Sequence, residues 1–259
     1  MLRREFLESS MKASVAGLGL GGAGLVPWSL AKATEIGERE AAFDASTVEQ
    51  ALTALYGTAN YLPSQDVTLT VPDKAELGAE VPVALSSSLP DVRSVSLLVT
   101  TAANPLAIVF RPGEGTDPAF STRVEICRTS HVIGVVETSG KLYGARQPVY
   151  VRAEVGCVGK REPDTTDYEP KGSIRWRLRR RRGRVRMKAR IRHPMTTAHH
   201  LKELRLASRK EQVFVAYFGA AVSENPELEI SFSQERRGYF ELSWRDTRGM
   251  SSSESTHLK

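Results

Sequence analysis

The chain has 259 residues, of which 41% are hydrophobic and 25% are charged, and its formal net charge is +6 at pH 7. These values are ordinary for a globular protein and exclude a chain too polar to form a hydrophobic core. The length is enough for one large domain or two small ones.

The first 33 residues have the pattern of an export signal. The pair Arg3-Arg4 precedes a weakly apolar, Gly- and Ala-rich stretch over residues 13–26, and an A-x-A site ends at Ala33. A transmembrane anchor is the alternative, but this stretch is glycine-rich and too short to span about 30 Å of hydrocarbon well. We therefore expect residues 1–33 to be a twin-arginine-type signal peptide that is cleaved after export. The mature protein would then be periplasmic and not attached to the membrane.

Positive charge is concentrated in one segment. Removing residues 1–33 lowers the net charge to +4, and residues 171–192 alone contain twelve Lys and Arg and no acid. Part of this segment alternates, with apolar residues at positions 185, 187, 189 and 191 and basic residues between them, which predicts a strand with a basic outer face. The alternatives are a docking face for an acidic partner or for the other half of the chain, and a nucleic-acid site. An exported protein meets little nucleic acid, so we expect no nucleic-acid partner.

One short helix is predicted near the start of the mature chain. Thr47 can cap it, and Gln50 follows three residues later, which together form a capping box. Val48, Ala51, Leu52 and Leu55 make an apolar stripe, and Gly57 can end the helix.

The chain then changes to short strands separated by Gly, Pro, Asn and Asp. Seven such runs fill residues 65–155, which is typical of an antiparallel sandwich. Residues 160–183 contain acids and prolines without an apolar period and predict a linker. Five more runs follow over residues 184–249 and predict a smaller second sandwich, with residues 251–259 as an edge strand or a tail. We expect an all-β protein with four parts: residues 1–33, 34–159, 160–183 and 184–259.

The chain lacks the common catalytic and metal-binding motifs. It has no H-E-x-x-H, paired C-x-x-C, phosphate loop or G-x-S-x-G, so we expect no enzyme, no cofactor and no metal site. His199 and His200 are adjacent, but neighbours on a strand point to opposite faces and would not easily share a metal ion. The five histidines, at positions 131, 193, 199, 200 and 257, are interpreted as surface or interface residues.

The two cysteines have different surroundings. Cys127 lies between a strand-like run and a turn, where a small apolar core residue is expected. Cys157 follows Gly156 and precedes Gly159, and these glycines let the backbone bend and a bulky partner approach. The nearby cations favour its thiolate. Three interpretations remain: a carrier thiol at Cys157, a Cys127–Cys157 disulfide and an inert thiol.

Several motifs resemble the SoxY and SoxZ subunits of the sulfur carrier of bacterial thiosulfate oxidation. The first half resembles SoxY in VTLTVPDKAELGAEVPVALSSSLPDVRSVSLLV, NPLAIVF and STRVEICRTSHVIGVVETSGKLY. The second half resembles SoxZ in RIRHPM, FVAYFGAAVSENPELEISF and ELSWRDTRGMSSSES. The chain is therefore identified as a member of the SoxYZ family with both subunits fused.

The resemblance implies two immunoglobulin-like sandwiches that pack against each other, preceded by the short helix. It also implies a non-catalytic carrier that holds thiosulfate-derived sulfur, including persulfide, on Cys157, with Gly156 and Gly159 giving the arm flexibility. Val155 and Val158 replace two glycines of the family motif, so the arm should swing less. The implied partners are periplasmic sulfur-oxidation enzymes with c-type cytochrome and hydrolase components. The alternative is a docking module for a periplasmic quinoprotein dehydrogenase.

Overall fold

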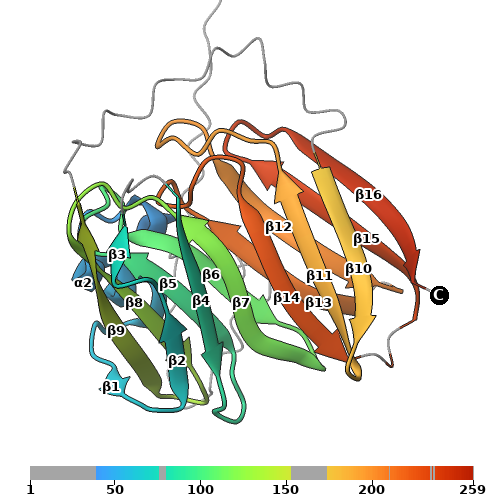
Figure 1. Ribbon diagram of the computed structural model, residues 1–259, viewed down its shortest axis with the longest axis horizontal. Coiled ribbons are helices and arrows are strands. Elements are labelled where there is room, and N and C mark those ends of the chain that lie inside the picture. Colours follow the sequence, from blue (N-terminus) through green and yellow to red (C-terminus); the bar gives the residue numbers. More distant parts are fainter. Residues whose placement is uncertain are drawn as a thin grey trace, which may run out of the picture.

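The computed structural model describes residues 39–75, 80–152, 174–209, 211–233, 235 and 237–258. The export signal predicted over residues 1–33 and the predicted arm residues Gly156, Cys157 and Gly159 lie outside these ranges. The described part of the chain is mostly strand, with helical segments only near its start (Figure 1). The all-β prediction with immunoglobulin-like sandwiches is confirmed.

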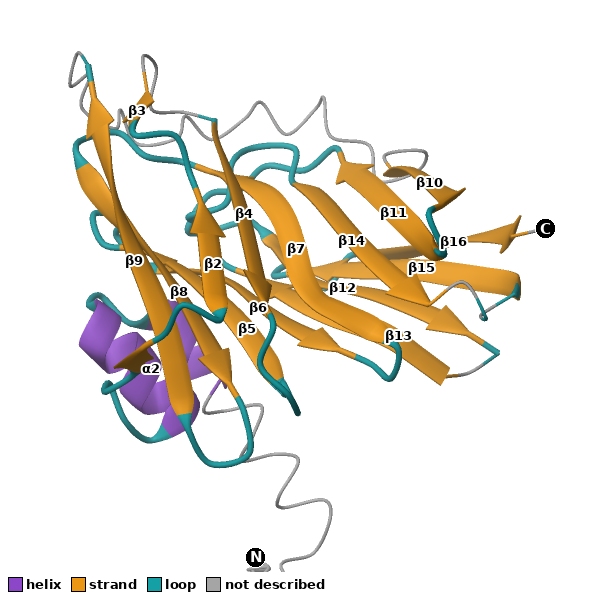
Figure 2. Ribbon diagram, turned by 60° about the horizontal axis from the view of Figure 1, so that its bottom comes forward, coloured by secondary structure: helices purple, strands orange, loops and turns teal. Residues whose placement is uncertain are grey.

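The predicted helix forms with the predicted cap residues, although the Gln50 side chain of the capping box accepts from the Ser46 N–H at 3.3 Å rather than from Thr47. Helix α2 spans Val48–Tyr56, the Thr47 side chain accepts from the Gln50 N–H at 3.1 Å, and Gly57 ends the helix at φ 75°. A helical turn over residues 39–44 precedes it. Ala51 and Leu52 are buried and pack on one face of the larger sheet (Figure 2). In the part of the chain that the structure describes, no helix is long and apolar enough to cross a membrane.

Hydrogen bonds of Tyr56 fix the end of α2 to the sheet. The Tyr56 hydroxyl lies 2.6 Å from Ser96 Oγ and 3.0 Å from Ser94 Oγ, and the Ser94 hydroxyl donates to Glu137. Burial raises the pKa of Tyr56 to about 12, so this hydroxyl keeps its proton at any physiological pH.

Sixteen strands are described, and they fall into two groups along the chain. The first half holds β1 (Leu62–Pro63), β2 (Val67–Thr70), β3 (Lys74–Ala75), β4 (Val81–Ser87), β5 (Ser94–Val99), β6 (Leu106–Pro112), β7 (Thr116–Val124), β8 (Ser130–Glu137) and β9 (Leu142–Val151). The second half holds β10 (Ile174–Arg181), β11 (Arg184–Ile191), β12 (Leu201–Ser208), β13 (Glu211–Phe218), β14 (Glu227–Ser233), β15 (Gly238–Asp246) and β16 (Ser251–Leu258).

Both sheets run from one half of the chain into the other. The larger sheet has the order β1-β9-β8-β5-β6-β13-β12-β15-β16, with β3 beside β9, and the smaller has the order β10-β11-β14-β7-β4-β2. Strand β6 pairs with β13 on both sides of the central pair Phe110↔Ala216. Strand β7 pairs with β14 at Phe120↔Ile230 (Figures 1 and 2). The two halves are therefore joined by backbone hydrogen bonds in both layers.

One hydrophobic core lies between the two sheets and crosses the junction. Phe110 of β6 is fully buried, and its ring centroid lies 5.6 Å from that of Phe120 and 5.6 Å from that of Phe214. A second aromatic pair, Phe232 and Phe240, fills the core of the second half. Alternating apolar residues from both halves belong to one continuous buried cluster.

One expectation needs correction, and one choice between two alternatives is decided by the structure. The linker predicted over residues 160–183 extends too far, because Ile174–Arg181 form β10 and pair with β11 along its whole length. The apolar alternation of Ile174, Trp176 and Leu178 was obscured by the arginines between them. The polar end is an edge strand, β16, because its backbone pairs with β15.

Candidate functional site

The last element before Cys157 is β9, and the sheet holds it firmly to its end. Residues 142–149 pair with β8, and the Tyr150 and Arg152 N–H groups donate to Asp73 and Ala75 carbonyls at 2.8 and 3.0 Å. Arg152 is the last described residue on this side. Five residues lead from it to Cys157, and five extended residues reach at most about 18 Å. Backbone hydrogen bonds therefore hold the base of the predicted arm in place up to Arg152.

Cys127 lies beside this base, just after the end of β7. The Val151 N–H donates to Thr129 Oγ1 at 3.3 Å, which places the Cys127–Thr129 segment against the end of β9. Cys127 is half-buried and is disulfide-bonded, so the expectation of a plain apolar core residue is wrong. The chain has two cysteines, and the other one, Cys157, lies outside the described residues.

The chain re-enters the described structure at the same end of the sandwich. Ile174, the first residue of β10, pairs with Ile191, the last residue of β11. In Figure 1 the ends of β9 and β11 and the start of β10 all lie at the upper end of the molecule. The segment that contains Cys157 is therefore attached at this end on both sides.

The hairpin of β10 and β11 carries the basic face that the sequence predicts. Arginines of β10 are exposed at positions 175, 177, 179, 180 and 181, and a shallow cavity of about 530 Å³ lies between arginines of β10 and β11. Arg186 and Lys188 pair with Glu229 and Glu227 of β14, while Arg184 pairs with Asp117 of β7. These acids pair with basic side chains of β11. Most of the unpaired positive charge of the described hairpin therefore lies on β10.

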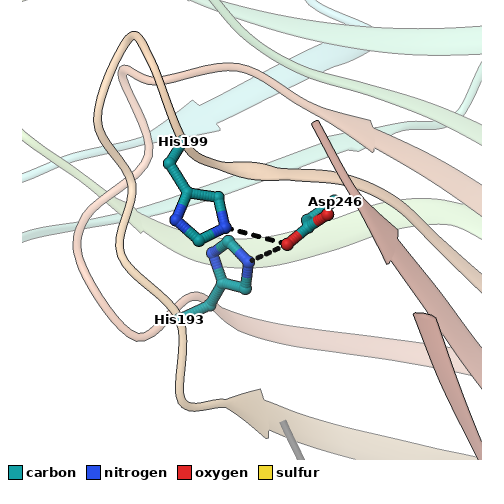
Figure 3. Close-up of side chains that lie close together, drawn as sticks. All are labelled: His193, His199 and Asp246. Carbon is teal, nitrogen blue, oxygen red and sulfur yellow. Dashed lines mark hydrogen bonds and ion pairs between the residues drawn. The ribbon is translucent and has the colours of Figure 1, made fainter. Parts of the chain in front are cut away.

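Two histidines and a carboxylate converge near the end of β11 (Figure 3). His193 follows β11, His199 precedes β12, and Asp246 ends β15. Asp246 Oδ2 lies 3.3 Å from His193 Nε2 and 2.8 Å from His199 Nε2. His193 and Asp246 are buried, so His193 does not fit the surface alternative of the surface-or-interface interpretation.

The surrounding groups hold each member of this cluster in place. Asp246 Oδ1 accepts from the Arg248 and Met250 N–H groups at 2.9 and 2.8 Å, which leaves Oδ2 facing the histidines. Burial opposes ionisation of Asp246, but the hydrogen bonds from His199, Met250 and His193 together outweigh it and lower its pKa.

The two histidines are held separately. His193 Nδ1 lies 2.5 Å from the Pro194 carbonyl oxygen, and the Trp244 ring packs edge-on against its imidazole. Burial lowers the pKa of His193, against the hydrogen bonds to Pro194 and Asp246. The His199 backbone N–H donates to Thr196 Oγ1 at 2.9 Å, which closes the loop on which His199 lies.

The sequence did not identify this cluster. It singled out the neighbours His199 and His200, which lie in the loop before β12 and not on a strand. His200 Nδ1 lies 3.0 Å from the Thr196 carbonyl, whereas His199 Nε2 lies 2.8 Å from Asp246 Oδ2. The partner of His199 is His193, six residues earlier across a loop, together with a residue 47 positions later. No local spacing indicates such a set.

The fold and site define a two-part β-sandwich protein whose halves share both sheets and whose connecting segment carries a cysteine. Two family models match it: the sulfur oxidation protein SoxY over residues 52–157, and the sulphur oxidation protein SoxZ over residues 175–257. The chain therefore belongs to the SoxYZ sulfur-carrier family, with a SoxY domain and a SoxZ domain fused in one chain. This membership supports a sulfur-oxidation carrier role.

Solved structures and curated proteins add little to this assignment. The sulfur carrier protein SoxY from Chlorobium limicola f thiosulfatophilum is 30% identical, and the match covers 45% of this chain and 99% of that chain with a TM-score of 0.39. A Salmonella alpha-2-macroglobulin reacted with methylamine is 10% identical over 74% of this chain and 16% of its own, with a TM-score of 0.26. No curated protein matches the chain.

Proposed function

We propose that the protein is a periplasmic carrier that holds thiosulfate-derived sulfur covalently on Cys157 and presents it to partner enzymes. The observation that carries this proposal is that the SoxY match runs to residue 157 and so includes the cysteine. The fixed end of β9 supports it, because a rigid base with a short arm presents one thiol at a defined end of the sandwich. The twin-arginine-type signal over residues 1–33 gives the proposed route to the periplasm.

The disulfide at Cys127 adds a step before loading. In a chain whose Cys157 is bridged to Cys127, Cys157 has no free sulfur, so a dithiol of a partner protein must first reduce the bridge, supplying two electrons and two protons and leaving two thiols. Loading then joins the Cys157 sulfur to the outer sulfur of thiosulfate. This oxidation releases one proton and two electrons, which the c-type cytochrome component of the partner accepts. The carrier itself supplies position and no catalytic group.

Mass spectrometry of the native protein tests this proposal. The protein is isolated from cells that are oxidising reduced sulfur and is digested without reductant. We expect a fraction of the Cys157 peptide to carry added mass that reductant removes, and the size of that mass identifies the cargo. A Cys157 peptide found only unmodified or only bridged to Cys127 would contradict the carrier function.

The exposed arginines of β10 favour a second candidate, a docking module for a quinoprotein dehydrogenase or another acidic partner. Replacing Arg177 and Arg179 by Gln should weaken partner binding and make it less sensitive to salt, because exposed charge interactions are screened by ions. Binding measured over a salt series checks this, with the exposed Lys141→Gln as the matched control on a turn of the first half. Equal salt dependence in all three proteins would exclude β10 as the docking face.

A further inference from the structure

His193, His199 and Asp246 form a group whose donor atoms all lie within 4.8 Å of one another in the described structure. The three side chains come from the ends of β11 and β15 and from the loop before β12, and they point toward one centre (Figure 3). This location differs from Cys157 and from the basic face of β10. The proposed carrier function does not use it.

The hydrogen bonds of His193 direct its second ring nitrogen into the cluster. The Pro194 carbonyl can only accept, so His193 Nδ1 carries the hydrogen in their 2.5 Å contact. His193 Nε2 then faces Asp246 Oδ2 at 3.3 Å, and His199 Nε2 faces the same oxygen at 2.8 Å. Two imidazole nitrogens and a carboxylate oxygen that converge in this way can share a proton or bind a metal cation.

The contacts outside the cluster are those that metal ligands use. Ligating histidines usually donate their second ring N–H to a carbonyl or a carboxylate, and ligating carboxylates are themselves hydrogen-bonded. His193 does the first through Pro194, and Asp246 does the second through the Arg248 and Met250 N–H groups. The donor atoms of His193 and Asp246 are therefore oriented by groups that would not compete for the ion.

The two distances to Asp246 fit a tetrahedral ion after a small adjustment. Metal–ligand bonds of about 2.0–2.2 Å place tetrahedral donors about 3.3 Å apart. His193 Nε2 and Asp246 Oδ2 already have that separation. His199 Nε2 is closer to the carboxylate, at 2.8 Å, and would have to move away by about half an ångström. It lies on a loop and has the most exposed side chain of the three, so it is the ligand best able to adjust.

We propose that His193 Nε2, His199 Nε2 and Asp246 Oδ2 bind a divalent transition-metal ion of the zinc type. Two imidazoles and one carboxylate suit Zn²⁺, and three protein ligands leave a fourth position for water or another small ligand. The proposal departs from the expectation of no metal site, which rested on motifs with short spacing. The site lies at the end of the sandwich where the segment carrying Cys157 is attached, since His193 comes two residues after Ile191, the partner of Ile174.

The test is metal binding by the purified full chain after chelator treatment. Calorimetric titration with Zn²⁺ should give one strong site per chain, and the zinc-loaded protein should melt at a higher temperature, because a ligand that binds the folded state stabilises it. Co²⁺ should give the visible absorption of a tetrahedral ion without the intense charge-transfer band of a thiolate ligand.

Three variants locate the site. His199→Ala removes a ligand from a loop, and Asp246→Asn keeps an oxygen that can accept from Arg248 and Met250. Each should weaken Zn²⁺ binding by at least about the 100-fold loss that outer-shell changes can cause. His200→Ala, the matched control next to His199, should bind as tightly as the original chain. No strong site, a thiolate band, or unchanged affinity in His199→Ala would overturn the proposal and leave the cluster a hydrogen-bonded clamp.

Discussion

Replacing Cys157 by Ser should abolish covalent loading with sulfur. Serine has nearly the same size but lacks the sulfur nucleophile, so neither an S-thiosulfonate nor a persulfide can form. The fold should survive, because strand β9 is held by the sheet up to Arg152 without help from the cysteine. The measurement is intact-protein mass after incubation with the partner enzymes and thiosulfate, with a melting curve to check folding.

Cys127→Ser is the matched control for this experiment. It removes the disulfide of Cys127 and leaves the Cys157 thiol in place, so we expect loading without any prior reduction. The unaltered chain, in its bridged form, should load only after treatment with a dithiol. If Cys127→Ser alone stops loading, Cys127 is the carrier residue and the assignment of Cys157 is wrong.

Replacing Phe110 by Ala should lower the free energy of unfolding by about 3–5 kcal/mol, the usual cost of removing a buried phenylalanine. Phe110 is on β6 in the first half and contacts Phe120 and Phe214, which lie on the two sides of the junction. Because the halves share both sheets and one core, the loss should destabilise them together.

Tryptophan fluorescence can test whether the two halves unfold together. Trp176 and Trp244 both lie in the second half, and Trp28 is in the predicted signal, so fluorescence of the mature chain reports on the second half. Urea unfolding of Phe110→Ala should show the tryptophan transition at a lower midpoint.

Leu97→Ala, which lies one strand further from the junction, should lower this midpoint too. Tyr239→Ala, at a side chain that is 72% exposed, should change it by less than about 0.5 kcal/mol. An unchanged tryptophan transition in Leu97→Ala would mean that the halves unfold independently.

The sequence predicted the helix and the strands better than it predicted which strands lie beside each other. Helix α2 was clear because its cap at Thr47, its apolar stripe and its terminal Gly57 agree. Most strands were clear because apolar residues alternate in them. A period of two says which face of a strand is buried, however, and does not say which strand lies beside it. The pairing of β6 with β13 and of β7 with β14 therefore could not be read from the pattern.

In the candidate site, too, features that are local in sequence were predicted and features that depend on the folded chain were not. Cys157 was found from its flanking glycines and the family resemblance, both of which are local in sequence. Strand β10 was missed because dense arginines covered its alternation, and the disulfide at Cys127 remained one of several alternatives. The group of His193, His199 and Asp246 depends on a loop closing and on the place where β15 ends, which are properties of the folded chain.

The sharing of both sheets also bears on what the covalent connection contributes. Strands β6 and β13 and strands β7 and β14 make the junction with backbone hydrogen bonds, and none of these four strands is the connecting segment. A single cut between Arg152 and Ile174 would therefore leave two polypeptides still joined as a heterodimer. What the connection adds is a fixed one-to-one stoichiometry and a high effective concentration of each half for the other. Dilution can separate two subunits, but it cannot separate the halves of this chain.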